Sequence, residues 1–302
     1  MVLITGGATG IGYGCATQFG KHGAKVAIMS RRKPVIDAAV ESLAAAGIEA
    51  FGVQGDVRDF GKCEAACAAV VARWGRLDFL INNAAGNFMV SAEQLTPNGY
   101  ATVLGIDLQG CFHMSRAALP HMKVTGPDDG AVIINITATL QDSATPFQAH
   151  AASAKAGIDV LTNTLGVEWG EYGIRTVGLA PGGIAGTVGG PGGRVFSNDQ
   201  NNATGVKAGT VVPEDPSPAE LRRKGIPAGR WGRVDDVALS AVFLCTAAAG
   251  WITATRLTID GGSVHVNGRG FPDAKRFVEK KSAQQKQTYK GGVKTSKVLA
   301  KL

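Results

Sequence analysis

A glycine-rich segment near the amino terminus has the composition of a phosphate-binding loop. It reads Thr5-Gly6-Gly7-Ala8-Thr9-Gly10-Ile11-Gly12 and lies between an apolar run and the start of a helical pattern. Glycines let the backbone turn sharply and approach a pyrophosphate, and the first turn of a helix presents unpaired N–H groups and partial positive charge. The segment therefore predicts a dinucleotide site that includes Gly6, Thr9, Gly10, Ile11 and Gly12.

The residues after the second apolar run distinguish between dinucleotides. Ser30 is followed by Arg31, Arg32 and Lys33, at a point where a cofactor with a free ribose 2′-hydroxyl would favour an acidic residue. Cationic side chains at this point pair with a 2′-phosphate. The pattern therefore predicts NADPH as the cofactor, bound in part by Arg31 and Arg32. A solvated basic turn is the alternative interpretation.

Two further strand ends contribute candidate nucleotide contacts. Asp56 and Val57 close the third predicted strand, where an aspartate can meet the adenine amino group. Asn83 and Ala84 lie in the sequence Asn82-Asn83-Ala84-Ala85-Gly86, which closes the fourth predicted strand on the side expected for the nicotinamide. Because ligands of open α/β sheets bind at the carboxyl ends of the strands, we expect these residues to lie beside the glycine-rich loop.

The elements that must position these residues follow a regular order. Apolar runs alternate with longer segments of helical period, which indicates right-handed βαβ units. We predict an α/β fold, a single doubly wound domain with a parallel seven-stranded sheet and helices on both faces. The predicted strands are Val2–Thr5, Lys25–Ser30, Ala50–Gln54, Phe79–Asn82, Ala131–Thr137, Thr176–Ala180 and Arg256–Ile259. One helix is predicted to begin at Ile11 and another to run from His150 to Trp169. The first strand begins almost at Met1, which suggests a truncated start or a mispredicted initiation site.

The composition limits the class of protein. Of 302 residues, 45% are hydrophobic, and no apolar run approaches the roughly 18 residues that suggest a membrane span. The amino terminus lacks the pattern of a secretory signal. The cysteines are scattered along the chain and favour buried core positions in a reducing compartment over disulfides or a metal site: Cys15, Cys63, Cys67, Cys111 and Cys245. We therefore expect a soluble protein with no metal site and no membrane insertion.

Most of the net charge of +7 comes from the carboxyl-terminal tail. Residues 269–302 contain ten Lys or Arg and two acidic residues. Because the rest of the chain is nearly neutral, we do not expect a nucleic-acid partner. The last three residues, Ala300-Lys301-Leu302, are a variant of the Ser-Lys-Leu peroxisomal address. This ending predicts a peroxisomal location and binding by an import receptor.

A long irregular segment follows the sixth predicted strand. It covers residues 185–233 and includes Gly189-Gly190-Pro191-Gly192-Gly193. Loops of this length in a compact domain are usually functional or disordered, and this one leaves the sheet edge where ligands bind. We interpret it as a substrate loop that covers the site. A mobile insertion without a role is the alternative.

These motifs together resemble the short-chain dehydrogenase/reductase superfamily over residues 2–262. The resemblance rests on glycines 6, 10 and 12, the Asn82–Gly86 sequence, Lys155 and Pro181-Gly182. It implies that residues 1–268 form a Rossmann domain that binds NADP and that the tail, residues 269–302, lies outside it. It also adds Lys155, Pro181, Gly182, Ile184 and Thr187 to the cofactor contacts.

Three positions depart from the usual pattern of this superfamily. Most members carry a Tyr four residues before the Lys and a Ser thirteen residues before that Tyr. Ala151 and Ala138 occupy these positions, and Asp107 replaces the usual Asn. An ordinary alcohol–ketone reductase would lose its proton donor and its carbonyl-polarising hydroxyl together, so the departures argue against that activity.

The departures resemble one branch, the peroxisomal 2,4-dienoyl-CoA reductases. The similar segments are Ala84–Phe88, Ile106-Asp107, Asn135–Leu140, His150–Lys155, Val167–Gly170 and Leu179–Thr187. The resemblance implies reduction of 2,4-dienoyl-CoA to 3-enoyl-CoA by a homotetramer, in the peroxisomal β-oxidation of unsaturated fatty acids. Lys155 would hold the nicotinamide ribose, and Asp107 would handle the proton through a raised pKa. The alternative role for Asp107 is an ionised partner that only positions Lys155.

The same resemblance implies an acyl-CoA substrate contacted by Arg31, Arg58, Phe88 and Arg194. Phe88 as a core residue is the alternative at that position. Two other functions stay open. The first is a related reductase recruited to a biosynthetic pathway, acting on an unsaturated acyl thioester. The second is a non-catalytic nucleotide-binding protein that kept the fold. The presence of Lys155 and Asp107 favours catalysis.

Overall fold

In the described part of the chain, seven parallel strands form one sheet in the order β3-β2-β1-β4-β5-β6-β7. The structure is a computed structural model, and it describes residues 1–123, 130–142, 144–187, 190 and 216–266. The strands are β1 (Val2–Thr5), β2 (Val26–Ser30), β3 (Ala50–Gln54), β4 (Phe79–Asn82), β5 (Val132–Ile136), β6 (Arg175–Pro181) and β7 (Thr255–Ile259). The predicted doubly wound α/β fold is confirmed, and each strand ends within one residue of its predicted bounds.

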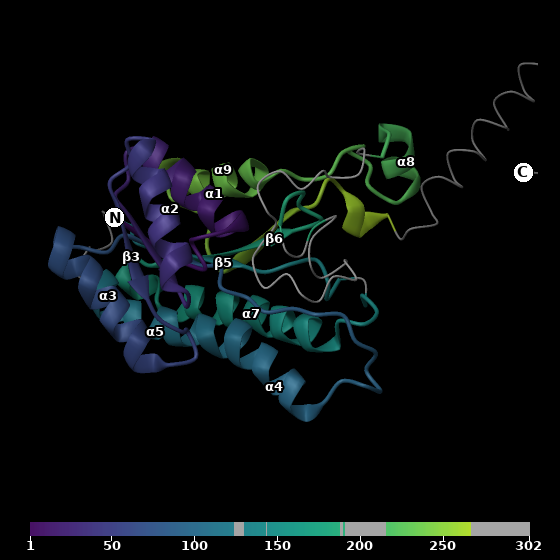
Figure 1. Cartoon of the computed structure of the whole chain (residues 1–302), viewed down its shortest axis with the longest axis horizontal. Coiled ribbons are helices and arrows are strands. Elements are labelled where there is room, and N and C mark those ends of the chain that lie inside the picture. The colour runs from purple at the N-terminus through teal and green to yellow at the C-terminus, as the bar shows by residue number, and fades with distance from the viewer. Residues whose placement is uncertain (124–129, 143, 188–189, 191–215, 267–302) are drawn as a thin grey trace, which may run out of the picture. The chain divides into compact units, whose positions relative to one another are not determined.

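Helices cover both faces of the sheet (Figure 1). One face carries α1 (Gly10–Lys21), α2 (Lys33–Ala45) and α9 (Val234–Leu244). The other carries α3 (Phe60–Trp74), α5 (Gly110–Met122) and α7 (Ala149–Glu168). Along this second face, α4 (Pro97–Leu104) continues through a π-helical turn, η1 (Gly105–Gln109), into α5. Short 3-10 turns lie at η3 (Gly170–Tyr172), η4 (Ala247–Ala249) and η5 (Ser263–His265).

The core consists of two apolar layers, one on each side of the sheet. Successive side chains of a strand point to opposite faces, so Ile4 packs with α1, α2 and α9 while Leu3 packs with α3, α5 and α7. Because both layers are covered, β1 and β5 are buried along their whole length. This burial explains why the strands are continuous apolar runs rather than alternating ones.

The cysteines are free thiols, and four of them are buried in the core. Burial raises the pKa of Cys15, Cys63 and Cys67 to about 12, so these thiols stay protonated and act as apolar packing groups. The described residues contain no group of three or more His, Cys, Asp or Glu side chains that could hold a metal ion. No described helix is both long enough and apolar enough to cross a membrane.

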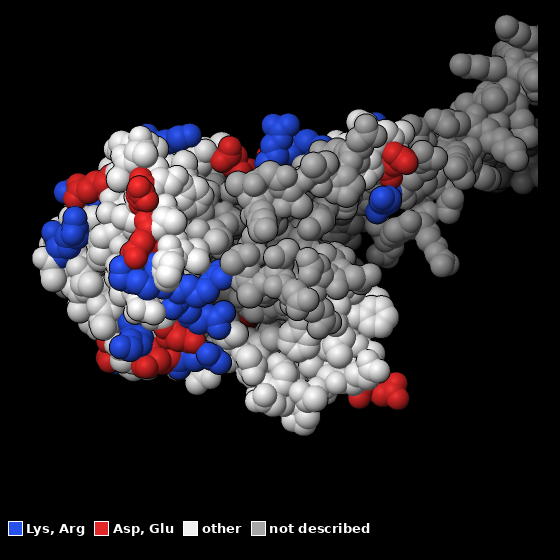
Figure 2. All heavy atoms as spheres, viewed as in Figure 1, with Lys and Arg blue, Asp and Glu red and all other residues white. Residues whose placement is uncertain are grey.

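Charges of both signs mix on the surface. Figure 2 shows Lys and Arg beside Asp and Glu over the region where α2, α3 and α5 lie in Figure 1. Exposed ion pairs such as Lys25–Glu49, at 3.1 Å, and Lys33–Asp37, at 2.6 Å, are part of this pattern. The described part of this face is therefore not a continuous basic surface.

The described residues separate into two compact units. The first comprises residues 1–187, 190 and 231–260, and the second comprises residues 216–230 and 261–266. In the second unit, α8 (Pro218–Arg223) begins with a capping box, in which the Glu220 N–H donates to the Ser217 hydroxyl and the Ser217 N–H donates to the Glu220 carboxylate. The prediction that residues 185–233 are irregular throughout is therefore wrong at α8, because the capping residues and Pro218 stabilise a helix there.

The two ends of the predicted substrate loop lie side by side in the first unit. Ile184 and Gly232 form a parallel bridge, in which the Ala185 N–H donates to the Gly232 carbonyl at 2.9 Å and the Gly232 N–H donates to the Gly183 carbonyl at 3.0 Å. The segment therefore leaves and returns at the carboxyl end of β6. Residues 188–189 and 191–215, including Arg194, lie outside the described residues, as do the tail and Ala300-Lys301-Leu302.

Candidate active site and nucleotide cleft

A cavity of about 700 Å³ opens at the carboxyl ends of β1 to β6. This volume is in the range of small-molecule and cofactor pockets. It gathers residues from six separate loops, and most of the predicted cofactor contacts line it: Gly6, Thr9, Gly10, Ile11, Arg31, Arg32, Asp56, Val57, Asn83, Ala84, Lys155, Pro181, Gly182, Ile184 and Thr187. Asp107 lines the same cavity, whereas Gly12, Arg58 and Phe88 do not.

The glycine-rich loop has a backbone that only glycine fits well. Gly6 and Gly10 have φ angles of +61° and +55°, in the left-handed region. Gly12 does not line the cavity, but a Cβ there would collide with the Gly6 carbonyl oxygen. Because α1 begins at Gly10, its first N–H groups lie where Thr9, Gly10 and Ile11 line the cavity. The loop is therefore built to accept a pyrophosphate at a helix amino terminus.

Asn83 braces this loop against the end of β4. Its side-chain amide donates to the carbonyls of Thr5 and Gly6 at 3.0 and 3.3 Å. In return, the Thr5 hydroxyl accepts from the backbone N–H groups of Asn83 and Ala84 at 2.9 and 3.0 Å. The side chain of Asn83, a predicted cofactor contact, thus fixes the shape of the glycine-rich loop.

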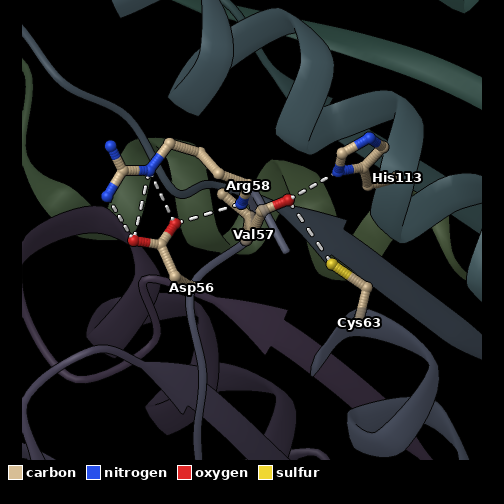
Figure 3. Close-up of polar contacts among 5 residues, drawn as sticks. All are labelled: Asp56, Val57, Arg58, Cys63 and His113. Carbon is tan, nitrogen blue, oxygen red and sulfur yellow. Dashed lines mark hydrogen bonds and ion pairs between the residues drawn. The ribbon is translucent and has the colours of Figure 1, made fainter. Parts of the chain in front are cut away.

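Asp56 is engaged by Arg58 two residues later. Figure 3 shows the guanidinium folded back onto the carboxylate, with Arg58 Nη2 at 2.6 Å from Asp56 Oδ2 and Arg58 Nε at 3.1 Å from Oδ1. The hydrogen bonds from Arg58 hold the pKa of the Asp56 carboxyl below its usual range. Asp56 therefore lines the cavity as an ionised carboxylate. Arg58, predicted to contact the substrate, lies outside the lining and pairs with Asp56.

The backbone between these two residues is anchored on two helices. The Val57 carbonyl accepts from His113 Nδ1 of α5 at 3.0 Å and from the Cys63 thiol of α3 at 3.5 Å (Figure 3). Val57 also packs against Gly110, where a Cβ would lie 2.5 Å from a Val57 methyl group. The loop after β3 is thereby fixed at one side of the cavity.

The two predicted catalytic residues form a buried ion pair. Lys155 Nζ lies 3.3 Å from Asp107 Oδ2 and donates to the Ile136 carbonyl at 3.0 Å. The Gly86 N–H donates to Asp107 Oδ1 at 2.7 Å. Asp107 and Lys155 are only 2% and 8% exposed. The pair therefore sits in a protein environment of low polarity at the cavity wall.

Asp107 has competing influences on its protonation. Burial raises the pKa of its carboxyl, while the Lys155 ammonium and the Gly86 N–H favour the ionised form. Burial has the larger effect, so the net direction is upward. Asp107 thus pairs with Lys155 and has a carboxyl pKa above its usual range.

The position of Asp107 depends on a feature that the sequence did not reveal. Asp107 lies in η1, the π-helical turn between α4 and α5. A π-helical turn inserts an extra residue in the helix, and such turns occur often at functional sites. The turn begins at Gly105 and Gly110 follows it, but glycines in a helical pattern also occur at close packing contacts and near helix ends. No other signal in the sequence indicated the turn.

Alanine occupies positions 138 and 151, where most members of the superfamily that this sequence resembles carry a hydroxyl group. Ala138, after β5, and Ala151, in the first turn of α7, both line the cavity with Lys155. The structure therefore places the two alanines in the lining of the same cavity as the ion pair. The cavity wall offers a carboxyl and an ammonium group there, and neither position 138 nor 151 supplies a hydroxyl.

A buried network of amide and hydroxyl side chains lies between the strands and the helices that hold the ion pair. Asn82 Nδ2 donates to the Ser115 hydroxyl at 3.0 Å and to Asn135 Oδ1 at 2.9 Å. Asn135 Nδ2 in turn donates to the Thr162 hydroxyl at 2.9 Å. These bonds connect β4 and β5 to α5 and α7, the helices adjoining Asp107 and carrying Lys155. The side chains thereby fix the relative positions of the two helices.

The loops after β4 and β5 meet beside the cavity. Asn87 Nδ2 donates to Gln148 Oε1 at 2.5 Å, and the Val90 N–H donates to the Phe147 carbonyl at 3.0 Å. Phe88 is 39% exposed and its ring lies 4.3 Å from that of His150, which is fully buried. The core alternative for Phe88 is therefore wrong, since the ring keeps an exposed face at the edge of this loop.

Comparisons with known proteins identify the family. A family model described as enoyl-(acyl carrier protein) reductase matches residues 6–264. The crystal structure of a short chain dehydrogenase from Bacillus anthracis str. 'Ames Ancestor' is 35% identical, with a TM-score of 0.71, and the match covers 87% of this chain and 95% of that one. This chain belongs to the short-chain dehydrogenase/reductase superfamily. The resemblance predicted from the sequence is confirmed.

Curated relatives point to one branch of the superfamily. A peroxisomal 2,4-dienoyl-CoA reductase of Arabidopsis thaliana, named as (3E)-enoyl-CoA-producing, is 39% identical over 93% of this chain and 92% of its own length. The enzyme of that name from Rattus norvegicus is 36% identical over 87% of this chain and 83% of its own length. A probable 2,4-dienoyl-CoA reductase of Bacillus subtilis, named as (2E)-enoyl-CoA-producing, is 36% identical over 86% and 95%.

The chain is thus an oxidoreductase of this superfamily, which implies a nicotinamide nucleotide as cofactor. The structure fits such a nucleotide. Gly6 and Gly12 leave the loop without side chains in the places where a Cβ would meet Asn83 or the Gly6 carbonyl, and the first turn of α1 faces the cavity. Lys155 lines the same cavity from α7.

Proposed function

We propose that this enzyme reduces 2,4-dienoyl-CoA to 3-enoyl-CoA with NADPH. The observation that carries the proposal is the buried Asp107–Lys155 pair, at 3.3 Å, in a cavity wall where Ala138 and Ala151 supply no hydroxyl. A ketone reductase must protonate an alkoxide as it forms, which is the usual task of a tyrosine. Conjugate reduction of a dienoyl thioester forms no alkoxide, so the missing hydroxyls are compatible with it. The names of the curated relatives support the same reaction.

The bound nicotinamide would supply a hydride to the δ-carbon of the dienoyl group. The electron pair of the γ,δ double bond shifts along the chain, so that negative charge gathers on the thioester oxygen as a dienolate. Lys155 is buried beside the cavity, and its ammonium group adds positive potential near this developing charge. Lys155 also donates to Ile136, which fixes its Nζ while it binds the cofactor ribose.

Protonation then decides the product. A proton delivered to the α-carbon gives the 3-enoyl thioester, whereas a proton delivered to the γ-carbon gives the 2-enoyl thioester. Asp107 is the group we assign to this step, directly or through a water, because its carboxyl lines the cavity and burial raises its pKa. The Gly86 N–H bond to Oδ1 orients the carboxyl, so Oδ2 is the oxygen nearer to Lys155.

Arg31 and Arg32 support NADPH rather than NADH. Both residues line the cavity directly after β2, where the ribose of the adenosine half is expected. Gln54 Nε2 donates to the Arg31 carbonyl at 3.0 Å, so the backbone of this turn is held independently of the arginine side chain. A 2′-phosphate would find two guanidinium groups at this position.

The remaining parts of the proposal concern substrate, location and assembly. We propose that Arg31, Arg58, Phe88 and Arg194 contact the coenzyme A ester, and that Ala300-Lys301-Leu302 directs the enzyme to peroxisomes through the import receptor. The location of the curated plant and rat relatives, as their names state it, supports this address. Deleting the three residues and following the protein by fluorescence in cells tests it, because retained peroxisomal import would refute the signal.

A homotetramer is the assembly we propose. Phe112 of α5 and Val160 and Val167 of α7 are 45%, 66% and 75% exposed, and an apolar groove beside them is lined by Tyr100, Leu104, Leu108, Phe112 and Leu161. Exposed apolar surface of this kind favours contact with another copy. Replacing Phe112 by Arg should lower the mass measured by light scattering, and an unchanged tetramer mass would exclude this face.

The assay that tests the proposed reaction uses purified protein and 2,4-hexadienoyl-CoA. We expect loss of NADPH absorbance matched mole for mole by loss of the dienoyl chromophore, with slower turnover when NADH replaces NADPH. Binding of NADPH without turnover of any unsaturated acyl-CoA would contradict the proposal and favour a non-catalytic protein. Turnover of other acyl thioesters, without dienoyl-CoA, would favour the biosynthetic alternative.

A further inference from the structure

Arg256 joins three elements beside the active site. Its Nη1 lies 2.9 Å from Asp159 Oδ2 on α7, and its Nη2 lies 2.8 Å from Asp142 Oδ1 in the segment after β5. Gln141 also donates to Asp159 Oδ2. The three charged side chains are only 19–24% exposed, so water screens this network less than an ordinary surface ion pair.

Both carboxylates lie close in sequence to residues of the cavity wall. Asp142 follows Leu140 by two residues, and residues 138–140 line the cavity. Asp159 follows Lys155 by four residues, which places it one turn further along the same face of α7. Neither aspartate lines the cavity, and Arg256 does not either. The network therefore acts on the site through the wall and the helix.

The wall that Arg256 holds is part of a strained segment. Ala144 and Phe147 have φ angles of +48° and +64°, a region that residues with a side chain rarely adopt. Such backbone persists only where surrounding contacts hold it, and it is found often at functional sites. At its far end the segment is tied to the loop after β4 through Gln148 and Asn87. Arg256 supplies the tie at the near end.

The sheet is shaped to accommodate the arginine. Arg256 of β7 pairs in register with Gly178 of β6. A Cβ at Gly178 would lie 3.3 Å from Arg256 Cγ, which is tighter than most such contacts. The alkyl stem of the arginine therefore lies across a residue without a side chain, on its way to both aspartates.

We propose that Arg256, Asp142 and Asp159 form a clamp that positions residues 138–140, the part of the cavity wall that we assign to the acyl thioester, against the helix that carries Lys155. The inference rests on the proposed function for the identity of the ligand. The glycine-rich loop and Arg31, where the nucleotide is expected, have no part in the clamp. The three residues are positioning residues, and they control binding of the acyl group without touching it.

Replacing Arg256 by Gln tests the clamp. The change leaves two carboxylates facing each other without a cation, so the wall should move away from α7. We expect the KM for 2,4-hexadienoyl-CoA to rise about tenfold while the KM for NADPH stays within about twofold of wild type. Hydrogen exchange should quicken in peptides that cover residues 138–142 and 144–148, with unchanged exchange at β1 and α1. A general loss of stability would instead raise both KM values and quicken exchange throughout.

A matched control removes a cation from an ion pair remote from the cavity. Lys25 pairs with Glu49 at 3.1 Å, so Lys25→Gln makes the same charge change as Arg256→Gln. We expect wild-type KM values and exchange for this variant. If the Arg256 variant fails to fold, Asp142→Asn removes one arm of the clamp and should give a smaller change in the same direction.

The outcomes separate the clamp from the proposed reaction. If wild-type enzyme does not act on dienoyl-CoA, the proposed function fails. The clamp can still be tested in that case, by comparing hydrogen exchange at residues 138–142 and the affinity for NADPH between wild type and Arg256→Gln. Unchanged exchange in this wall and unchanged KM in both Arg256→Gln and Asp142→Asn would overturn it. Equal rises in both KM values would also overturn it, because the clamp is inferred to act on one end of the cavity only.

Discussion

Asp107 Oδ2 lies 3.3 Å from Lys155 Nζ, although one residue belongs to a π-helical turn and the other to a separate helix 48 positions further along the chain. The pair is buried, and a backbone N–H of Gly86 holds the second carboxylate oxygen. A carboxyl in this setting can donate a proton, and the ammonium beside it can stabilise negative charge on a substrate. Substitution of Asp107 and variation of pH should separate these two contributions.

Replacing Asp107 by Asn should remove proton donation and leave the shape of the cavity intact. We expect kcat to fall about 100-fold or more, since general acid catalysis contributes on that scale. The affinity for NADPH, measured by fluorescence titration, should stay near that of wild type. Glu64→Gln on the exposed surface of α3 is the control and should have wild-type kcat. Undiminished kcat in the Asp107 variant would remove its assigned role.

The pH dependence of kcat should reflect the same carboxyl. Burial raises the pKa of Asp107, and the protonated form is the one that donates. Activity that depends on Asp107 is therefore present at low pH and is lost as the pH rises through the raised pKa. Steady-state kcat measured across this range should show that descending limb in wild type, and Asp107→Asn should lack it. A limb of the same position in both proteins would assign it to another group.

Arg31 should determine the preference for NADPH. Replacing it by Asp puts a carboxylate where a 2′-phosphate is expected, and that carboxylate can accept from a free 2′-hydroxyl. The ratio of kcat/KM for NADPH to that for NADH should fall about 100-fold, the scale of a lost hydrogen bond to a charged group. Coupled turnover with each nucleotide measures the ratio. An unaltered ratio would show that Arg31 is a solvated surface residue.

His150 should make a contribution to stability that mild acidification removes. Burial lowers the pKa of this imidazole in the folded protein, although the Asp107 carboxylate opposes the shift. The unfolded chain, with an ordinary pKa of about 6.5, therefore takes up this proton first as the pH falls. Urea unfolding should show that His150 contributes a loss of free energy of unfolding between about pH 7.5 and about pH 5.5, against the opposite contribution of the raised pKa of Asp107. His150→Phe, which keeps a ring against Phe88, should reduce this loss; the same pH dependence in both proteins would contradict the prediction.

Much of the fold was predictable from the sequence because both faces of the sheet are covered. A strand such as β1, buried along its whole length, must be a continuous apolar run, and such runs are visible in the sequence. The conformation of the glycine-rich loop was predictable for a similar reason, since Gly6 and Gly10 adopt positive φ angles that restrict the residue type. Local constraints of this kind leave a direct trace in the residues.

Other features leave weaker traces. The π-helical turn at Asp107 differs from ordinary helix by one residue, and side-chain periodicity does not resolve that difference. The helix α8 did have a signal, since Ser217 and Glu220 have capping-box spacing, but the segment as a whole was interpreted as irregular from its glycines and asparagines at 189–193 and 201–202. The pairing of Arg256 with Asp142 joins residues 114 positions apart, and nothing in the local sequence indicates it.

The site at which the product gains its proton tests the role of the Asp107–Lys155 pair most directly. Purified enzyme should be given 2,4-hexadienoyl-CoA and NADPH in heavy water, and the product examined by nuclear magnetic resonance and mass spectrometry. We predict 3-enoyl-CoA with one solvent deuterium on the α-carbon, formed far more slowly by Asp107→Asn. A 2-enoyl-CoA with deuterium on the γ-carbon, or no reduced acyl product, would contradict the proposed reaction.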